Sequence, residues 1–156
     1  MRRSKHAASL RLVIAGRGPL REKLEEQART LPGGAEFGFK SDDELLRLYQ
    51  TADLYVHASE VELAGMAVLE AMRCGCPAVT SDSGKSASKQ FALDEAHVFR
   101  TGDVQALSAR LDEWFENPAR LAQRRQKTLT AVKDYGLENT VAAYERLYER
   151  VVSQRC

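Results

Sequence analysis

The chain has 156 residues, enough for one domain with a hydrophobic core. Hydrophobic residues make up 44% and charged residues 29%, and the formal net charge is +1. Such a balanced charge gives no overall field that would draw the chain onto nucleic acid or an anionic membrane. The sequence contains no apolar run of about 18 residues and no signal peptide, so we expect no membrane span and only indirect membrane contact.

The cysteine pattern indicates a reducing compartment. There are three cysteines, Cys74, Cys76 and Cys156, and an odd number with a C-x-C pair does not suggest a disulfide framework. No second cysteine or histidine pair lies nearby, which disfavours a zinc site. We therefore expect a cytoplasmic protein without a metal.

Strands and helices are predicted to alternate along the first two thirds of the chain. Apolar, β-branched runs predict short strands at residues 10–15, 35–39, 53–58, 77–80 and 97–100. Capping and glycine signals predict helices at residues 19–31, 41–52, 65–74 and 86–93, and an all-helical segment at 103–115, 118–133 and 138–152. This alternation favours an α/β domain with a parallel sheet and helices on both faces.

The first and the last predicted helices each carry an apolar face. Leu20, Leu24 and Ala28 recur at four-residue spacing and predict a buried face on the first helix. The last helix has a longer apolar face, made of Val141, Tyr144, Leu147, Tyr148 and Val151.

Candidate ligand contacts follow the predicted strands, because ligands of an open parallel sheet bind beyond the carboxyl ends of its strands. Four such ends can be identified, at residues 16–18, 38–40, 57–65 and 81–85. Gly16 and Gly18 would let a ligand approach the backbone closely. They do not complete a dinucleotide fingerprint, since Arg21 takes the place of the third glycine and no acidic residue ends the next strand.

Glu62 and Glu70 lie eight residues apart, around the start of a predicted helix. The first N–H groups of that helix, at Gly65, Met66 and Ala67, lack acceptors within the helix and can bind an anion. Carboxylates on either side can accept hydrogen bonds from the hydroxyls of a ribose or hexose. The alternative is that both are surface glutamates favoured near a helix N-terminus.

The stretch S-x-x-E-x-x-G-x-x-x-L-E-A-M-x-x-G-x-P-x-V resembles the signature of retaining GT-B glycosyltransferases, a large family that includes sucrose synthases and many bacterial polysaccharide and glycolipid transferases. Its E-x7-E element matches Glu62 and Glu70. The segments LVIAGRGPLREKLEE and 36–56 also look like family blocks, so the resemblance covers about residues 10–152. It implies a Rossmann-like domain over residues 10–135 that binds a nucleotide sugar.

The resemblance also implies roles for single residues. Glu62 would be the catalytic carboxylate and hold hydroxyls of the transferred sugar, while Glu70 would hold the ribose. The N–H groups of Gly65 to Ala67 would bind the diphosphate. The remaining donor-binding candidates are the backbone at Gly16, Gly18, Phe39 and Lys40, with Lys85 (a phosphate contact or a solvated lysine) and His57 (a pocket residue or a packed histidine).

The implied reaction is transfer of a hexose, with retention, from a nucleotide sugar to a lipid or polysaccharide acceptor, without a metal. UDP-glucose is expected as the donor from its frequency in the family. The stretch SDSGKSASKQFALD resembles a subset that includes diacylglycerol glucosyltransferases. The alternative is a non-catalytic or split-subunit module that binds a nucleotide sugar. A response-regulator-like domain is disfavoured, because the strand ends lack its acidic cluster.

The resemblance further implies that part of the enzyme lies outside this chain. A GT-B enzyme has a second, N-terminal acceptor domain, and residues 1–9, expected to be disordered or a linker, do not encode the first strand and helix of the donor domain. The strands at 10–15 and 53–58 would then pair directly or borrow a strand from another chain, with self-association as a risk. We expect residues 136–156 to form a helix that packs on the domain or toward the missing one.

Overall fold

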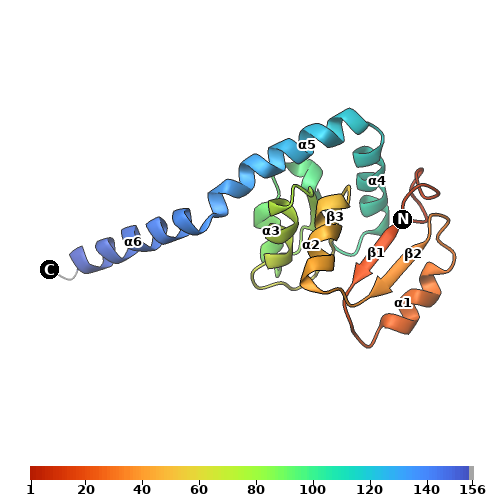
Figure 1. The fold of residues 1–156 in the computed structure, drawn as a ribbon, viewed down its shortest axis with the longest axis horizontal. Helices are drawn as coiled ribbons and strands as arrows, with labels where there is room; N and C mark the ends of the chain where they lie inside the picture. The colour runs from red at the N-terminus through yellow and green to blue at the C-terminus, as the bar shows by residue number, and fades with distance from the viewer. Residues whose placement is uncertain (155–156) are drawn as a thin grey trace.

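The computed structural model describes residues 1–154 and shows an α/β body from which one helix projects (Figure 1). The strands are β1 (Leu12–Ala15), β2 (Ala35–Gly38), β3 (Tyr55–His57), β4 (Ala78–Ser81) and β5 (Val98–Phe99). The α-helices are α1 (Arg21–Ala28), α2 (Asp42–Thr51), α3 (Met66–Arg73), α4 (Val104–Phe115), α5 (Pro118–Ala131) and α6 (Leu137–Ser153). Short 3-10 helices are η1 (Ala87–Phe91), η2 (Glu95–His97) and η3 (Val132–Tyr135).

The strands form two parallel sheets. β1 pairs with β2, starting from Leu12 opposite Ala35, and the second sheet has the order β3-β4-β5. Every pairing is parallel, which confirms the predicted fold class. Within residues 1–154 no strand pairing joins β1 to β3. The expectation that these two strands would pair directly is therefore wrong in this structure, while a strand supplied by another chain stays a prediction.

The core lies around β4 and α3. All four residues of β4 are buried, and α3 buries Val68, Ala71 and Met72. Val68 and Met72 pack with Phe91 of η1 and Val132 of η3. Helix α3 is therefore held by a tightly packed interior, and its first turn has a fixed position at the edge of the sheet.

The part formed by β1, α1 and β2 is less buried. Helix α1 has no buried residue, and Leu20 and Leu24 are 61% and 36% exposed. The prediction of a buried face on this helix is thus wrong. The reason is that a sheet of two strands offers the helix much less apolar surface than the expected continuous sheet.

The two ends of the chain differ in their contacts. The first nine residues, expected to be disordered or a linker, form turns, and the Ser4 hydroxyl donates to Oδ1 of Asp112 in α4 over 2.5 Å. Helix α6 has no buried residue, and its apolar face stays exposed, with Tyr144 55% and Tyr148 64% exposed. It extends away from the body (Figure 1) rather than packing on it. Cys156 lies outside the described residues.

Trp114 anchors α4 to the second sheet. Its side chain is 1% exposed, its Nε1–H donates to the backbone oxygen of Ala96 over 2.8 Å, and the Arg124 guanidinium lies 3.8 Å from its ring centre. Replacing a buried tryptophan by alanine leaves a cavity and typically costs about 3–5 kcal/mol. We predict that Trp114→Ala lowers the free energy of unfolding by about that amount, measured by urea denaturation. Exposed Leu137→Ala is the control and should change it by less than about 0.5 kcal/mol; equal effects would contradict the account.

Candidate functional site

The loop that carries Glu62 is fixed by backbone pairing to the loop that follows β4. The Glu62 N–H donates to the oxygen of Lys85 over 3.2 Å, and the Ala87 N–H donates to the oxygen of Glu62 over 2.8 Å. The Ser81 and Ser83 hydroxyls add bonds to the backbone oxygens of Ser59 and Glu60. These contacts bring two of the predicted strand ends together and place Glu62 between them.

Gly65 turns the chain from this loop into α3. Its φ of +70° is in the left-handed region, which favours glycine. Space also demands glycine, because a Cβ here would lie 2.8 Å from Cε2 of Phe91 and 3.2 Å from Cα of Ser88. Met66 and Ala67 follow in the first turn of α3, where the helix supplies no acceptor for their N–H groups.

The Glu62 carboxylate lies at the start of this helix. Its Oε1 accepts from the N–H groups of Gly65 at 3.1 Å and Ala64 at 3.2 Å. These bonds, first from Gly65 and then from Ala64, lower the pKa of Glu62 below its usual value, so the group is ionised at neutral pH. The Gly65 N–H, predicted to be free for an anion, is thus occupied by Glu62 in this structure.

Tyr55 lies near both carboxylates. Burial, with the negative charges of Glu70 and Glu62 nearby, raises the pKa of Tyr55 to about 12. The Tyr55 hydroxyl is 3.1 Å from Nδ1 of His57, whose Nε2 lies 3.5 Å from Oε2 of Glu62. Glu70 is exposed on the second turn of α3. The sequence analysis missed Tyr55, although its position two residues before His57 places both side chains on one face of β3.

The ends of β1 and β2 form a second group of the predicted residues. The Gly16 N–H donates to the oxygen of Gly38 over 2.9 Å, and Gly18 is exposed with open space around its Cα. The Phe39 ring is 61% exposed, with the Arg17 guanidinium 4.5 Å from its centre. This cation–π pair leaves an aromatic face at the sheet edge.

The two predicted lysines have different surroundings. The Lys40 side chain is mostly buried, and its ammonium pairs with Glu36. Lys85 is exposed in the loop that pairs with Glu62, and within residues 1–154 its side chain makes no salt bridge. Lys85 is therefore the one of the two whose charge is open to a ligand, whereas the charge of Lys40 is paired with Glu36. A ligand contact through the Lys40 backbone stays a prediction.

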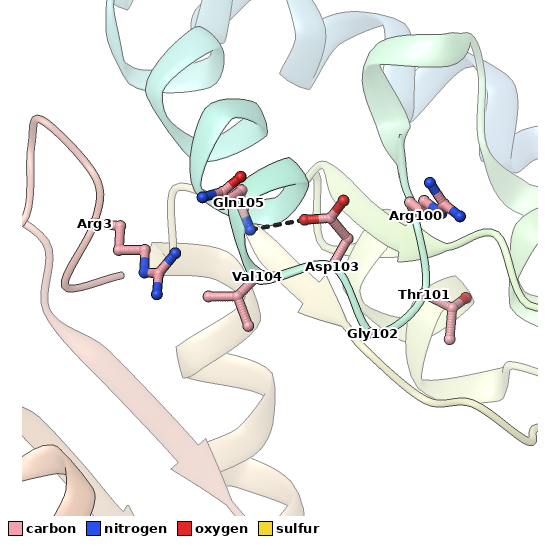
Figure 2. A pocket seen from close by; sticks show the side chains of 7 residues that line it. All are labelled: Arg3, Arg100, Thr101, Gly102, Asp103, Val104 and Gln105. Atoms are coloured by element: carbon pink, nitrogen blue, oxygen red, sulfur yellow. Dashed lines mark hydrogen bonds between the residues drawn. The ribbon is translucent and has the colours of Figure 1, made fainter.

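A separate hollow of about 510 Å³ lies at the start of α4 (Figure 2). It is lined by Arg3 and by residues 100–105, which comprise the loop after β5 and the first two residues of α4. The carboxylate of Asp103 is already engaged, because it accepts from the N–H groups of Gln105 and Ala106 over 2.9 Å. Arg3 and Arg100 lie on opposite sides of the turn and do not converge in Figure 2. None of the predicted donor-binding residues lines this hollow.

Two features of the described residues bear on other kinds of site. Residues 1–154 hold no group of three or more histidine, cysteine, aspartate or glutamate side chains arranged to bind a metal ion. Over the same residues, no helix combines the length and apolarity required to cross a membrane. Cys76 is buried, which raises the pKa of its thiol to about 12 and makes it a poor nucleophile.

The fold and the arrangement around α3 correspond to a known family. The sequence pattern of the family "Glycosyl transferases group 1" matches residues 1–141, and the chain belongs to this family. It is 47% identical over 104 residues to a GDP-mannose-dependent alpha-(1-6)-phosphatidylinositol dimannoside mannosyltransferase of Mycobacterium tuberculosis, covering 58% of this chain and 26% of the relative. It is 32% identical over 126 residues to the putative glycosyltransferase EpsD of Bacillus subtilis, covering 77% of this chain and 32% of the relative. The chain thus spans about a third or less of these relatives.

Solved structures show the same architecture. The catalytic domain of a cholesterol-alpha-glucosyltransferase from Helicobacter pylori matches with a TM-score of 0.81 and 37% identity, covering 85% of this chain and 84% of that one. Anabaena Alr3699/HepE in complex with UDP matches with a TM-score of 0.69 over 91% of this chain and 40% of that one, at 20% identity, and shows the fold alone. The predicted membership of the GT-B glycosyltransferase family is thus confirmed.

The fit around Gly65 gives a test of the site geometry. We predict that Gly65→Ala, through the strained φ and the contact with Phe91, lowers the free energy of unfolding by about 1–3 kcal/mol. Gly84→Ala is the matched control, because Gly84 lies in the paired loop with open space around it and no positive φ. Thermal or urea unfolding measures both, and a Gly65→Ala protein as stable as the Gly84→Ala protein would show that the turn into α3 is not as described.

Proposed function

We propose that this chain is the donor-binding part of a retaining glycosyltransferase that moves a hexose from a nucleotide sugar to a lipid or polysaccharide acceptor. The observation that carries the proposal is the first turn of α3, flanked by the Glu62 and Glu70 carboxylates at the carboxyl edge of a parallel sheet. Free N–H groups of Met66 and Ala67, together with the helix dipole, suit a diphosphate. The carboxylates suit the hydroxyls on either side of it.

The proposed chemistry is stabilisation of the leaving diphosphate. Oriented N–H groups at a helix N-terminus act on developing negative charge without having to reorganise, and such electrostatic effects are often the largest contribution to catalysis. Lys85, whose ammonium is open, would add a positive charge next to the same turn. We propose that no metal ion takes part.

The Gly65 N–H has to change partner if a phosphate binds there. At present it donates to Oε1 of Glu62. A phosphate that takes over this donor would leave Oε1 of Glu62 bonded to the Ala64 N–H alone. We propose that diphosphate binding and the final placing of Glu62 are coupled in this way.

The donor's identity is a finer part of the proposal. UDP-glucose is the donor that we expect, and the glucosyltransferase among the similar structures supports glucose as the sugar. The mannosyltransferase relative is GDP-mannose-dependent, which makes GDP-mannose the donor to compare directly. Phe39 at the edge of β2 is the exposed aromatic side chain placed to meet the base.

We also propose that a second polypeptide region supplies the acceptor half. The relatives are about three or more times longer than the part that this chain matches. The exposed apolar face of α6 projects from the body and would contact that half.

We place the protein in the cytoplasm, where Cys74 and Cys76 stay as thiols.

A calorimetric titration tests the proposed donor site. UDP, UDP-glucose and GDP-mannose are titrated into the wild-type chain and into two variants. Glu70→Gln should weaken UDP and UDP-glucose alike by about tenfold or more, since a charge-assisted bond to the ribose is lost. Glu62→Gln should weaken UDP-glucose by a similar factor without weakening UDP, because a neutral amide competes less well than a carboxylate for the Gly65 N–H.

Glu60→Gln is the control, since Glu60 is an exposed glutamate of the same loop whose carboxylate makes no hydrogen bond within residues 1–154. If no nucleotide or nucleotide sugar binds, or if all three variants behave alike, the donor site is wrong. The alternative function, a non-catalytic or split-subunit module, predicts donor binding without transfer even when an N-terminal acceptor polypeptide is added.

A further inference from the structure

Two side chains of β3 form a connected line to Glu62. Tyr55 and His57 are two residues apart, so they point to the same face of the strand. The Tyr55 hydroxyl is 3.1 Å from Nδ1 of His57, and the other ring nitrogen, Nε2, lies 3.5 Å from Oε2 of Glu62. The line therefore runs from the hydroxyl through the imidazole to the carboxylate.

The surroundings of each atom favour one arrangement of the protons. A carboxylate oxygen only accepts hydrogen bonds when ionised, so the imidazole nitrogen facing it is best protonated. In that tautomer Nδ1 accepts, and the Tyr55 hydroxyl donates to it. Tyr55 remains a donor at neutral pH, because its pKa is raised to about 12 by burial.

The Nε2 atom of His57 has an unused donor position. It is buried, and within residues 1–154 it has no hydrogen-bond partner, while the whole side chain is only 12% exposed. A buried donor without a partner is costly. Its distance of 3.5 Å to Glu62 is longer than an ordinary hydrogen bond, and contacts of this kind commonly shorten when a ligand arrives.

The hydrogen-bonding capacity of Glu62 shows what this arrangement achieves. An ionised carboxylate offers about four acceptor positions. The N–H groups of Gly65 and Ala64 use Oε1, and His57 faces one side of Oε2. One acceptor position on Oε2 is then left open to a ligand.

We infer that Tyr55 and His57 are positioning residues. They hold Glu62 so that one acceptor position on Oε2 stays free for a single hydroxyl of the transferred sugar. This inference rests on the proposed function only for the identity of the ligand. His57 thereby acts through Glu62 and does not itself contact the donor. Tyr55 acts one step further away, by fixing which nitrogen of His57 carries the proton.

The first test needs no ligand. Long-range ¹H–¹⁵N NMR correlation on the wild-type chain at pH 7.5 reports the tautomer of each imidazole, with His57 assigned from the signal lost in His57→Gln. We expect the Nε2–H form for His57, and we expect the second tautomer to become detectable in Tyr55→Phe. Tyr49→Phe is the control, because Tyr49 packs edge-to-face on Tyr55 without bonding to His57. An Nδ1–H form in the wild type, or an unchanged tautomer in Tyr55→Phe, would overturn the inference.

The second test compares two amides at position 57. The side-chain N–H of glutamine lies near the place of Nε2, whereas that of asparagine lies near Nδ1. We expect His57→Gln to bind the nucleotide sugar within about threefold of wild type, and His57→Asn to bind it about tenfold more weakly. Both variants should bind the free nucleoside diphosphate as tightly as the wild type does. Equal losses in both variants would mean that the ring only fills space. If the wild type binds no nucleotide sugar, the proposed function fails, and the tautomer measurement still decides the positioning role.

Discussion

The site depends on the way in which the backbone of Glu62 is held between two loops. Its N–H and its carbonyl oxygen are both bonded to the loop after β4, at Lys85 and Ala87. Its carboxylate bonds to the turn that starts α3. One residue thus ties the end of β3, the start of α3 and the end of β4 together. Because α3 and β4 are also the most buried elements, the carboxylate and the first N–H groups of the helix share one rigid frame.

The rest of the chain is less firmly assembled around that frame. The sheet is split between β1 and β3, and the half with α1 has little buried surface. The unpaired edges expose backbone N–H and carbonyl groups that favour pairing with another strand. Helix α6 presents an unpartnered apolar face far from the body (Figure 1). The half of the site built from Phe39 and Lys40 therefore rests on weaker packing than the half built from Glu62 and Glu70.

Local sequence signals predicted much of this structure, and long-range contacts account for the rest. The order of strands and helices and the turn at Gly65 followed from periodicity and glycine placement, because those signals are local. The break between β1 and β3, the exposed face of α1 and the outward course of α6 depend on what each element meets in space. The occupation of the Gly65 N–H by Glu62 also could not be predicted, since it depends on how the loop folds back. The placement of Tyr55 and His57 on one face could be predicted from the alternation of side chains along β3. Their contact with Glu62 could not.

The central claim is that a nucleotide sugar binds at the start of α3. The most direct measurement is a backbone ¹H–¹⁵N spectrum of the chain titrated with UDP-glucose and, separately, with GDP-mannose. The account predicts that one of them shifts the amide signals of Gly65, Met66 and Ala67, together with those of the paired loop at Lys85. Spectra in which both donors leave these amides unchanged, or shift only the residues around the hollow at 100–105, would contradict it.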